Sequence, residues 1–140
     1  MTYLDTSVLA AYYCPETLST RAENAILRAH QPAISQLVEV ELHSVLARKI
    51  REGALTKAEG LRIATQFRLH VNGAYYLRLP LETVHYEVAR DWIARFSTPL
   101  RTLDALHLAV TFSSDSVLLT SDAVLAKAAK HCGVRVQFVS

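Results

Sequence analysis

Short apolar segments alternate with longer helical patterns along the whole chain, and this alternation constrains the fold more than any other feature. Segments suitable for strands lie at Thr2–Leu4, Pro32–Ser35, Ala74–Leu79, Ser116–Leu119 and Val134–Val139. Strands that alternate with helices pair in parallel, and the helices then cover both faces of the sheet. We therefore predict an α/β protein with three layers (α/β/α) and a central, mostly parallel five-stranded sheet.

Helical spacing and helix-boundary residues occupy the chain between these strands. Thr56 followed by Glu59 is typical of a capping box at a helix start. Gly53 and Gly133 suit the position just beyond a helix end. We expect helices at Ser7–Tyr13, Thr17–Ala29, Gln36–Glu52, Thr56–Asn72, Leu81–Phe96, Leu103–Phe112 and Ser121–Cys132.

Length and composition limit the class of protein. The chain has 140 residues, which suits one domain over residues 1–140, and 51% are hydrophobic, enough for a sizeable core. No apolar run reaches the roughly 20 residues that cross a bilayer, and the N-terminus lacks the basic and apolar regions of a signal peptide. Cys14 and Cys132 lie outside any metal-binding pattern and are expected to be free thiols. We expect a cytoplasmic protein without a membrane segment.

Two acidic residues come directly after predicted strands. Asp5 follows the first strand, and Asp122 lies just after the fourth. In open parallel sheets, ligands bind beyond the carboxyl ends of the strands, so both residues are candidates for a site. The alternative for each is a helix N-cap, where Asp is favoured.

Glu41 lies on an apolar face of its predicted helix. Its neighbours three and four residues away include Leu37, Val38 and Val45, whereas Glu39 has more polar neighbours and is expected to be solvated. A buried carboxylate is costly unless it is paired or binds a metal. Glu41 is therefore a candidate metal ligand, with an ion pair to Arg or Lys as the alternative.

A polar stripe runs along the most apolar predicted helix. Asp104, His107 and Thr111 share one face of it. Asp104 alone is explained as an acid that complements the helix dipole, but that explanation does not cover the stripe. For His107, the alternatives are a hydrogen-bonded core histidine, a metal ligand, and a residue that orients a ligand or contacts RNA.

Together, Asp5, Glu41, Asp104 and Asp122 predict an acidic pocket that binds a divalent metal. Crowded carboxylates raise one another's pKa, and a hard cation such as Mg²⁺ or Mn²⁺ relieves this. The formal net charge of +2 allows an acidic pocket within a slightly basic surface, which suits a polyanion partner. We expect Ser7, Thr120, Ser121 and His107 to orient the ligands of this site.

Four segments contain these acids and hydroxyl groups: YLDTSVLAAYY (Tyr3–Tyr13), ISQLVEVEL (Ile34–Leu42), LRTLDALHLAV (Leu100–Val110) and LLTSDAVLAKAAKHCGV (Leu118–Val134). As a set, they resemble the motifs of the PIN-domain ribonucleases. The resemblance is closer to the VapC-type toxins of bacterial and archaeal toxin–antitoxin pairs. Order, spacing and total length also fit, so the resemblance covers essentially the whole chain.

This resemblance implies a PIN-like fold, with a five-stranded parallel sheet between helices, and metal-dependent endonucleolytic cleavage of RNA. It also implies a VapB-like antitoxin as the partner, and a homodimer. By their motifs, the metal-binding, catalytic acids would be Asp5, Glu41, Asp104 and Asp122.

Other proteins with acidic pockets provide alternatives. A phospho-acceptor receiver module requires a lysine after the last strand, and none follows here. A catalytically silent PIN-like domain that only binds proteins would be indicated by loss of a core acid, and all four are present. Structure-specific DNA nucleases of related fold usually carry insertions, for which 140 residues leave little room. We therefore predict a ribonuclease, with the last two classes as alternatives.

Overall fold

The computed structural model describes residues 1–140, in which every predicted helix and strand is present. The elements follow one another in the order β1 (Thr2–Leu4), α1 (Thr6–Tyr13), α2 (Ser19–Leu27), β2 (Pro32–Ser35), α3 (Gln36–Arg51), α4 (Lys57–Asn72), β3 (Leu77–Leu79), α5 (Thr83–Ala94), α6 (Thr102–Ser113), β4 (Val117–Thr120), α7 (Ala123–His131) and β5 (Val136–Phe138).

All strand pairs of the central sheet are parallel, in the order β3-β2-β1-β4-β5. The predicted five-stranded sheet is therefore confirmed. β1 lies in the middle, and all its residues are buried, as expected for a strand covered on both faces. The chain starts at the centre of the sheet, adds strands on one side, and then crosses to the other side of β1 with β4.

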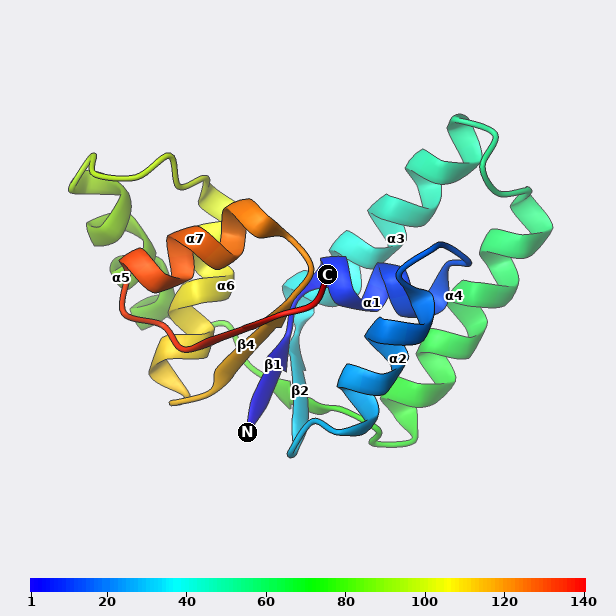
Figure 1. Ribbon diagram of the computed structural model, residues 1–140, viewed down its shortest axis with the longest axis horizontal. Coiled ribbons are helices and arrows are strands. Elements are labelled where there is room, and N and C mark those ends of the chain that lie inside the picture. Colours follow the sequence, from blue (N-terminus) through cyan, green and yellow to red (C-terminus); the bar gives the residue numbers. More distant parts are fainter.

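Helices cover both faces of the sheet, so the three-layer prediction is confirmed (Figure 1). Figure 1 shows α5, α6 and α7 on one side of the strands and α1 to α4 on the other. The capping box of Thr56 and Glu59 starts α4 as predicted. Gly53 and Gly133, beyond the ends of α3 and α7, adopt positive φ angles of 77° and 75°, which glycine allows at no steric cost. None of the helices combines the length and apolar character needed to cross a membrane.

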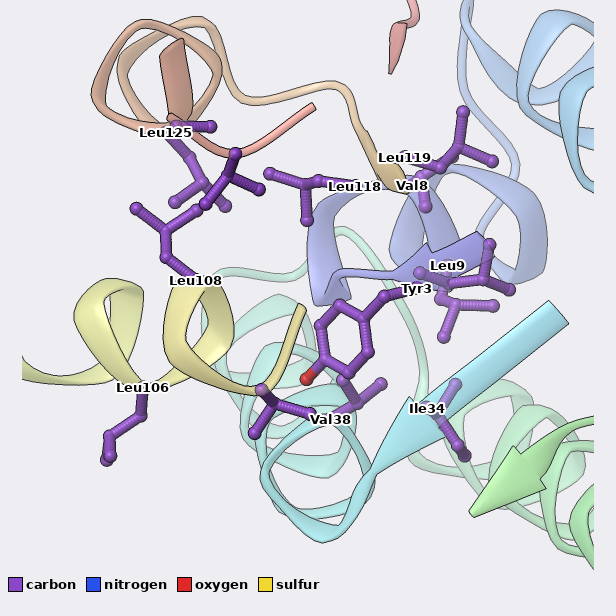
Figure 2. Packing of buried hydrophobic residues seen from close by; sticks show 14 of the residues in the cluster. Tyr3, Val8, Leu9, Ile34, Val38, Leu106, Leu108, Leu118, Leu119 and Leu125 are labelled. Carbon is purple, nitrogen blue, oxygen red and sulfur yellow. The ribbon is translucent and has the colours of Figure 1, made fainter. Parts of the chain in front are cut away.

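The hydrophobic core surrounds the central strands. Tyr3 and Leu4 of β1 and Leu118 and Leu119 of β4 are completely buried within one continuous apolar cluster. Figure 2 shows the ring of Tyr3 among apolar side chains of this cluster, with its hydroxyl oxygen at the end of the ring. This rigid core fixes the strand ends, from which the site described below is built.

The third strand is shorter than the predicted Ala74–Leu79, because Ala74, Tyr75 and Tyr76 form a turn after α4. Ala74 has a positive φ of 59°, and the backbone N–H of Tyr75 donates to the carbonyl oxygen of His70 at 3.0 Å. The ring of Tyr75 stacks on that of His70, with centroids 4.5 Å apart. These contacts wrap the chain around the helix end, so β3 begins only at Leu77.

Candidate metal centre

The central strand and its neighbour end side by side, which brings the first and last of the predicted acids to one edge of the sheet. Leu4 pairs with Leu119, and the backbone N–H of Asp5 donates to the Leu119 carbonyl oxygen at 3.2 Å. Asp122 lies just beyond the end of β4. Both acids therefore lie at the carboxyl edge of the sheet, where open α/β sheets bind ligands.

Asp5 is almost completely buried, and both its carboxylate oxygens accept hydrogen bonds. Oδ1 accepts from the Ser7 hydroxyl at 2.6 Å and from the Val8 backbone N–H at 3.3 Å, and Oδ2 accepts from the Thr120 hydroxyl at 2.9 Å. Burial raises the pKa of Asp5, and the bonds from Ser7 and Thr120 offset part of this rise. Asp5 is also the N-cap of α1. Capping uses only Oδ1, so it does not exclude a metal at Oδ2.

Hydroxyl groups link the two strand ends. The Ser7 Oγ lies 3.2 Å from the Thr120 Oγ1 and accepts the backbone N–H of Ser121 at 3.0 Å. The Thr120 Oγ1 also accepts the backbone N–H of Asp122 at 3.0 Å. Ser7 and Thr120 therefore connect Asp5 to Asp122 directly. Ser121 contributes its backbone N–H, whereas its hydroxyl forms no hydrogen bond within the protein.

Glu41 lies on α3 and reaches over the start of α1. Its Oε1 accepts from the Thr6 hydroxyl at 2.9 Å and forms a hydrogen bond with His107 Nε2. Burial alone raises the pKa of Glu41, but the bonds from His107 and Thr6 outweigh it and leave the pKa below its usual value. No Arg or Lys pairs with Glu41, so the ion pair considered from the sequence is replaced by a histidine contact.

Glu39 lies two residues earlier on α3 and has a different environment. Its carboxylate forms an ion pair with Arg78, with an N–O distance of 2.9 Å. The prediction that Glu39 is merely solvated was therefore incomplete. The two glutamates differ in partner: Glu39 has an arginine that neutralises it, and Glu41 has hydrogen-bond donors only.

Asp104 and Asp122 approach the same place from α6 and α7. The Asp104 carboxylate forms no hydrogen bond or ion pair with the protein. Burial raises the pKa of Asp104, and the negative charges of Asp122 and Glu41 raise it further. Asp122 is the N-cap of α7, and its Oδ1 accepts the backbone N–H groups of Val124 at 2.9 Å and Leu125 at 3.1 Å. The carboxylates of Asp122 and Glu41 therefore lie near enough to that of Asp104 to disfavour its ionised form.

His107 is buried beneath Glu41, and its second ring nitrogen contacts the core. Nδ1 lies 2.7 Å from the hydroxyl of Tyr3, which itself lies 2.7 Å from the hydroxyl of Ser35. Thr6, Tyr3 and Ser35 were not predicted as site residues. Thr6 is next to Asp5 in the sequence, and Tyr3 carries a hydroxyl inside a strand predicted to be buried. Both features could have marked them as candidate site residues.

A family model described as the PIN domain matches residues 2–131, which is most of the chain. The chain belongs to the PIN domain family. The matched region includes all four predicted acids: Asp5, Glu41, Asp104 and Asp122. No curated protein matches the chain. The family assignment therefore agrees with the motifs and with the observed sheet.

Solved structures similar to this PIN domain include proteins described as toxins or toxin–antitoxin complexes. VapC20 of Mycobacterium tuberculosis, a Sarcin-Ricin loop cleaving toxin, is 18% identical with a TM-score of 0.75, over 91% of this chain and 95% of that one. VapBC2 of Rickettsia felis, bound to a DNA fragment from their promoter, is 15% identical with a TM-score of 0.69, over 100% of both chains. A toxin–antitoxin complex of Klebsiella pneumoniae is 17% identical with a TM-score of 0.64, over 87% of both chains. At these identities, the similarity shows a shared fold.

A cavity of about 470 Å³ opens beside the acids of this PIN domain. Glu41 and Asp122 line it together with Thr6 and Ser7. Its far wall carries two basic residues from α3 and one acid: Arg48, Lys49 and Glu16. The cavity therefore joins the acidic strand ends to a basic surface about two helical turns beyond Glu41 along α3.

The donor set of this PIN domain suits a hard divalent cation. Carboxylate oxygens are the ligands that Mg²⁺ and Mn²⁺ prefer. None of the four acids forms an ion pair with Lys or Arg, so the protein supplies no cationic side chain in contact with them. As the side chains lie, no three His, Cys, Asp or Glu groups are close enough together to hold an ion. Coordination by several of these acids thus requires some of the carboxylates to move inward.

Proposed function

We propose that residues 1–140 form one PIN domain that acts as a metal-dependent endoribonuclease and as the toxin of a VapBC-type toxin–antitoxin pair. One observation carries this proposal. Asp122 and Glu41 lie near enough to Asp104 to raise its pKa, Thr120 bonds both the Asp5 carboxylate and the Asp122 backbone, and no Lys or Arg side chain pairs with any of the four acids. Proteins use such groups of acids to hold the cations that act on phosphate esters.

The residues that would hold Mg²⁺ or Mn²⁺ are Asp5, Glu41, Asp104 and Asp122. A cation there supplies Lewis-acid chemistry: it makes water a better nucleophile and neutralises charge that develops on phosphate oxygens. Asp5 and Glu41 are already oriented by hydrogen bonds from Ser7, Thr120, Thr6 and His107. Such support holds ligands in place before substrate arrives and lowers the cost of reaching the reactive geometry.

Water, rather than a side chain, is the proposed nucleophile. The hydroxyls of Thr6, Ser7 and Thr120 all donate their hydrogens to carboxylates. Each of these hydroxyls thus orients a carboxylate that would hold the metal, and we assign them that role rather than attack on phosphorus. Water attacks the phosphorus, and the bond from phosphorus to the leaving ribose oxygen breaks.

The basic wall of the cavity supports a polyanionic substrate. Glu41, Ser44 and Arg48 share one face of α3, at intervals of three and four residues. A strand whose scissile phosphate lies at Glu41 could therefore place a neighbouring phosphate near Arg48 or Lys49. Such contacts bind the backbone without reading the base sequence.

The toxin role rests on similarity. The solved structures include a Sarcin-Ricin loop cleaving toxin, a VapBC2 pair on promoter DNA and a toxin–antitoxin complex, all built on this fold. They support a VapB-like antitoxin as the protein partner and RNA as the substrate. The homodimer and the cytoplasmic location expected from the sequence belong to the same proposal.

The test is cleavage of purified RNA by the recombinant protein with Mg²⁺ or Mn²⁺, with chelator in place of metal, and with the variant Asp5→Asn. We expect internal cuts only for the wild-type protein with metal, while Asp5→Asn keeps the far-ultraviolet circular dichroism of a folded chain. Full activity of Asp5→Asn, on RNA and enzyme free of contaminating nuclease, would refute the assignment. Faster cleavage of DNA than of RNA would support the DNA nuclease alternative instead.

A further inference from the structure

A chain of hydrogen bonds runs from the buried core to one of the proposed metal ligands. The hydroxyls of Ser35 and Tyr3 lie 2.7 Å apart, and the Tyr3 hydroxyl lies 2.7 Å from His107 Nδ1. His107 Nε2 then contacts Oε1 of Glu41. Ser35 and Tyr3 are 0% exposed and His107 is 2% exposed. Bulk solvent therefore does not reach these groups, and the partners seen for Ser35, Tyr3 and His107 Nδ1 are one another.

The direction of these hydrogen bonds follows from the groups at the two ends. An ionised carboxylate only accepts, so His107 donates to Glu41 through a hydrogen on Nε2. If His107 is neutral, Nδ1 is then an acceptor and takes the hydrogen of the Tyr3 hydroxyl. The Tyr3 oxygen in turn accepts the hydrogen of Ser35. In this arrangement, every hydrogen of the chain has an acceptor.

The opposite direction leaves one group unpaired. With a hydrogen on Nδ1, His107 would donate to Tyr3, and Tyr3 would donate to Ser35. The Ser35 hydroxyl has no other side-chain or backbone partner and is completely buried. Its hydrogen would then lack an acceptor, which is costly inside a protein. The surroundings of Tyr3 and Ser35 thus select one form of His107.

We propose that His107 is a positioning residue that carries its hydrogen on Nε2 and fixes the rotation of the Glu41 carboxylate. Thr6 and His107 occupy Oε1, whereas Oε2 has no partner in the protein. Glu41 would therefore offer Oε2 to a metal ion, while Oε1 stays bonded to Thr6 and His107. This inference rests on the proposed function, and it adds Tyr3 and Ser35 as the residues that set the state of the histidine.

The first test reads the hydrogen positions directly in the metal-free protein. Nitrogen-15 labelling of the histidines distinguishes the two neutral forms and the charged form by NMR. The chain has six histidines, and His107→Gln assigns the signal by removing it. We expect a hydrogen on Nε2 only. A hydrogen on Nδ1, or on both nitrogens at neutral pH, would overturn the proposal.

A matched pair of tyrosine variants tests what selects this form. Tyr3→Phe removes the donor to His107 Nδ1, so we expect the nitrogen-15 signal of Nδ1 to change to that of an acceptor without a hydrogen bond, while the hydrogen stays on Nε2 opposite Glu41. Tyr13→Phe is the control, because the Tyr13 hydroxyl lies 2.6 Å from Nδ1 of His70, away from the site. It should change the His70 signal and leave that of His107 as it is. The same change in the Nδ1 signal of His107 in Tyr13→Phe would refute a specific role for Tyr3.

The second test separates positioning from simple support of the core, using the affinity for Mn²⁺ measured by electron paramagnetic resonance. His107→Gln can still donate an N–H near the position of Nε2, whereas His107→Leu fills space and cannot donate. We expect His107→Leu and Tyr3→Phe to weaken Mn²⁺ binding by about 10–100-fold, and His107→Gln by only a few-fold. Equal affinity in His107→Leu and the wild type would overturn the proposal.

The two tests also separate this inference from the proposed function. A wild-type protein that shows the Nε2 form but binds no Mn²⁺ would overturn the metal-dependent function and, with it, the positioning role. A wild-type protein that binds Mn²⁺ and cleaves RNA, while His107→Leu binds Mn²⁺ equally well, would overturn the inference alone.

Discussion

The four acids of the site form two pairs that the protein treats differently. Asp5 and Glu41 accept hydrogen bonds from side chains of other elements, namely Ser7, Thr120, Thr6 and His107. Asp104 has no partner, and Asp122 accepts only from backbone N–H groups at the start of its own helix. Asp5 and Glu41, the held pair, are thus fixed in orientation. Asp104 and Asp122, the free pair, can adjust.

This difference means that the held pair is in place before a metal binds, whereas the free pair can rearrange when it binds. The pKa of Glu41 is lowered by its donors, whereas the pKa of Asp104 is raised by burial and by its acidic neighbours. Asp5 and Glu41 have side-chain donors before any cation binds, although burial still raises the pKa of Asp5, whereas Asp104 and Asp122 have no side-chain donor. Metal binding should therefore rearrange Asp104 and Asp122 more than Asp5 and Glu41.

The largest expected effect compares two glutamates of one helix. Glu41→Gln should lower kcat for RNA cleavage by more than about 100-fold, because even residues that only orient a metal ligand contribute about 10–100-fold. Glu39→Gln is the matched control, since Glu39 pairs with Arg78 and should keep nearly full activity. Single-turnover cleavage assays measure both. Equal losses in the two variants would mean that the held pair is not part of the reaction.

A smaller effect is expected when the support of the held pair is removed. Ser7→Ala deletes the donor 2.6 Å from Asp5 but keeps all four carboxylates. We expect a loss of about 10–100-fold in activity at low Mg²⁺, with partial recovery at high Mg²⁺. Ser114→Ala serves as the control, because Ser114 is hydrogen-bonded at the opposite edge of the sheet. A Mg²⁺ titration of both variants decides whether fixing Asp5 matters.

Arg48→Ala should affect substrate binding rather than chemistry. We expect KM to rise by up to about 5-fold, as for the loss of one exposed charge contact, with kcat nearly constant. The logarithmic salt dependence of binding should become less steep by about 0.7 for each lost phosphate contact with a single strand. Arg51→Ala, farther along α3 and outside the cavity, is the control. A fall in kcat without a change in KM would place Arg48 among the groups that act on the reaction.

The smallest expected effect is a gain in stability when Asp104, one acid of the free pair, loses its charge. Asp104→Asn should raise the melting temperature of the metal-free protein by roughly 1–4 °C at neutral pH. The sign follows from the raised pKa: the folded state disfavours the ionised form, so stability falls as pH rises through the folded pKa. The neutral amide removes that cost, which stays small because Asp104 is only half-buried. Calorimetry with and without Mn²⁺, with Asp115→Asn as control, tests this.

The sequence predicted the fold well where local signals were strong. β1 and β2 have the predicted boundaries, because a charged or helix-starting residue ends each of them, after Leu4 and after Ser35. Glu41 was singled out by its apolar neighbours, and the structure places it against His107, half-buried. Asp5 and Asp122 were placed at one edge because parallel strands share their carboxyl ends.

The contacts that hold the acids could not be predicted, because they join distant parts of the chain. Thr6 reaches Glu41 across 35 residues, and His107 reaches it across 66. Those contacts depend on the strand order and on how α3 and α6 lie beyond the sheet, which no local pattern encodes. Tyrosine is common in strands, so the sequence does not show which group the Tyr3 hydroxyl contacts. Only the structure reveals its hydrogen bond to His107.

The strand order also decides when the site can exist during synthesis. β1 is made first, but its neighbour β4 and the acid beyond it, Asp122, come close to the C-terminus. A nascent chain that has reached only α5 contains Asp5 and Glu41 and lacks Asp104, His107, Thr120 and Asp122. The four acids and the groups that support them can therefore come together only after α6, β4 and the start of α7 have been made.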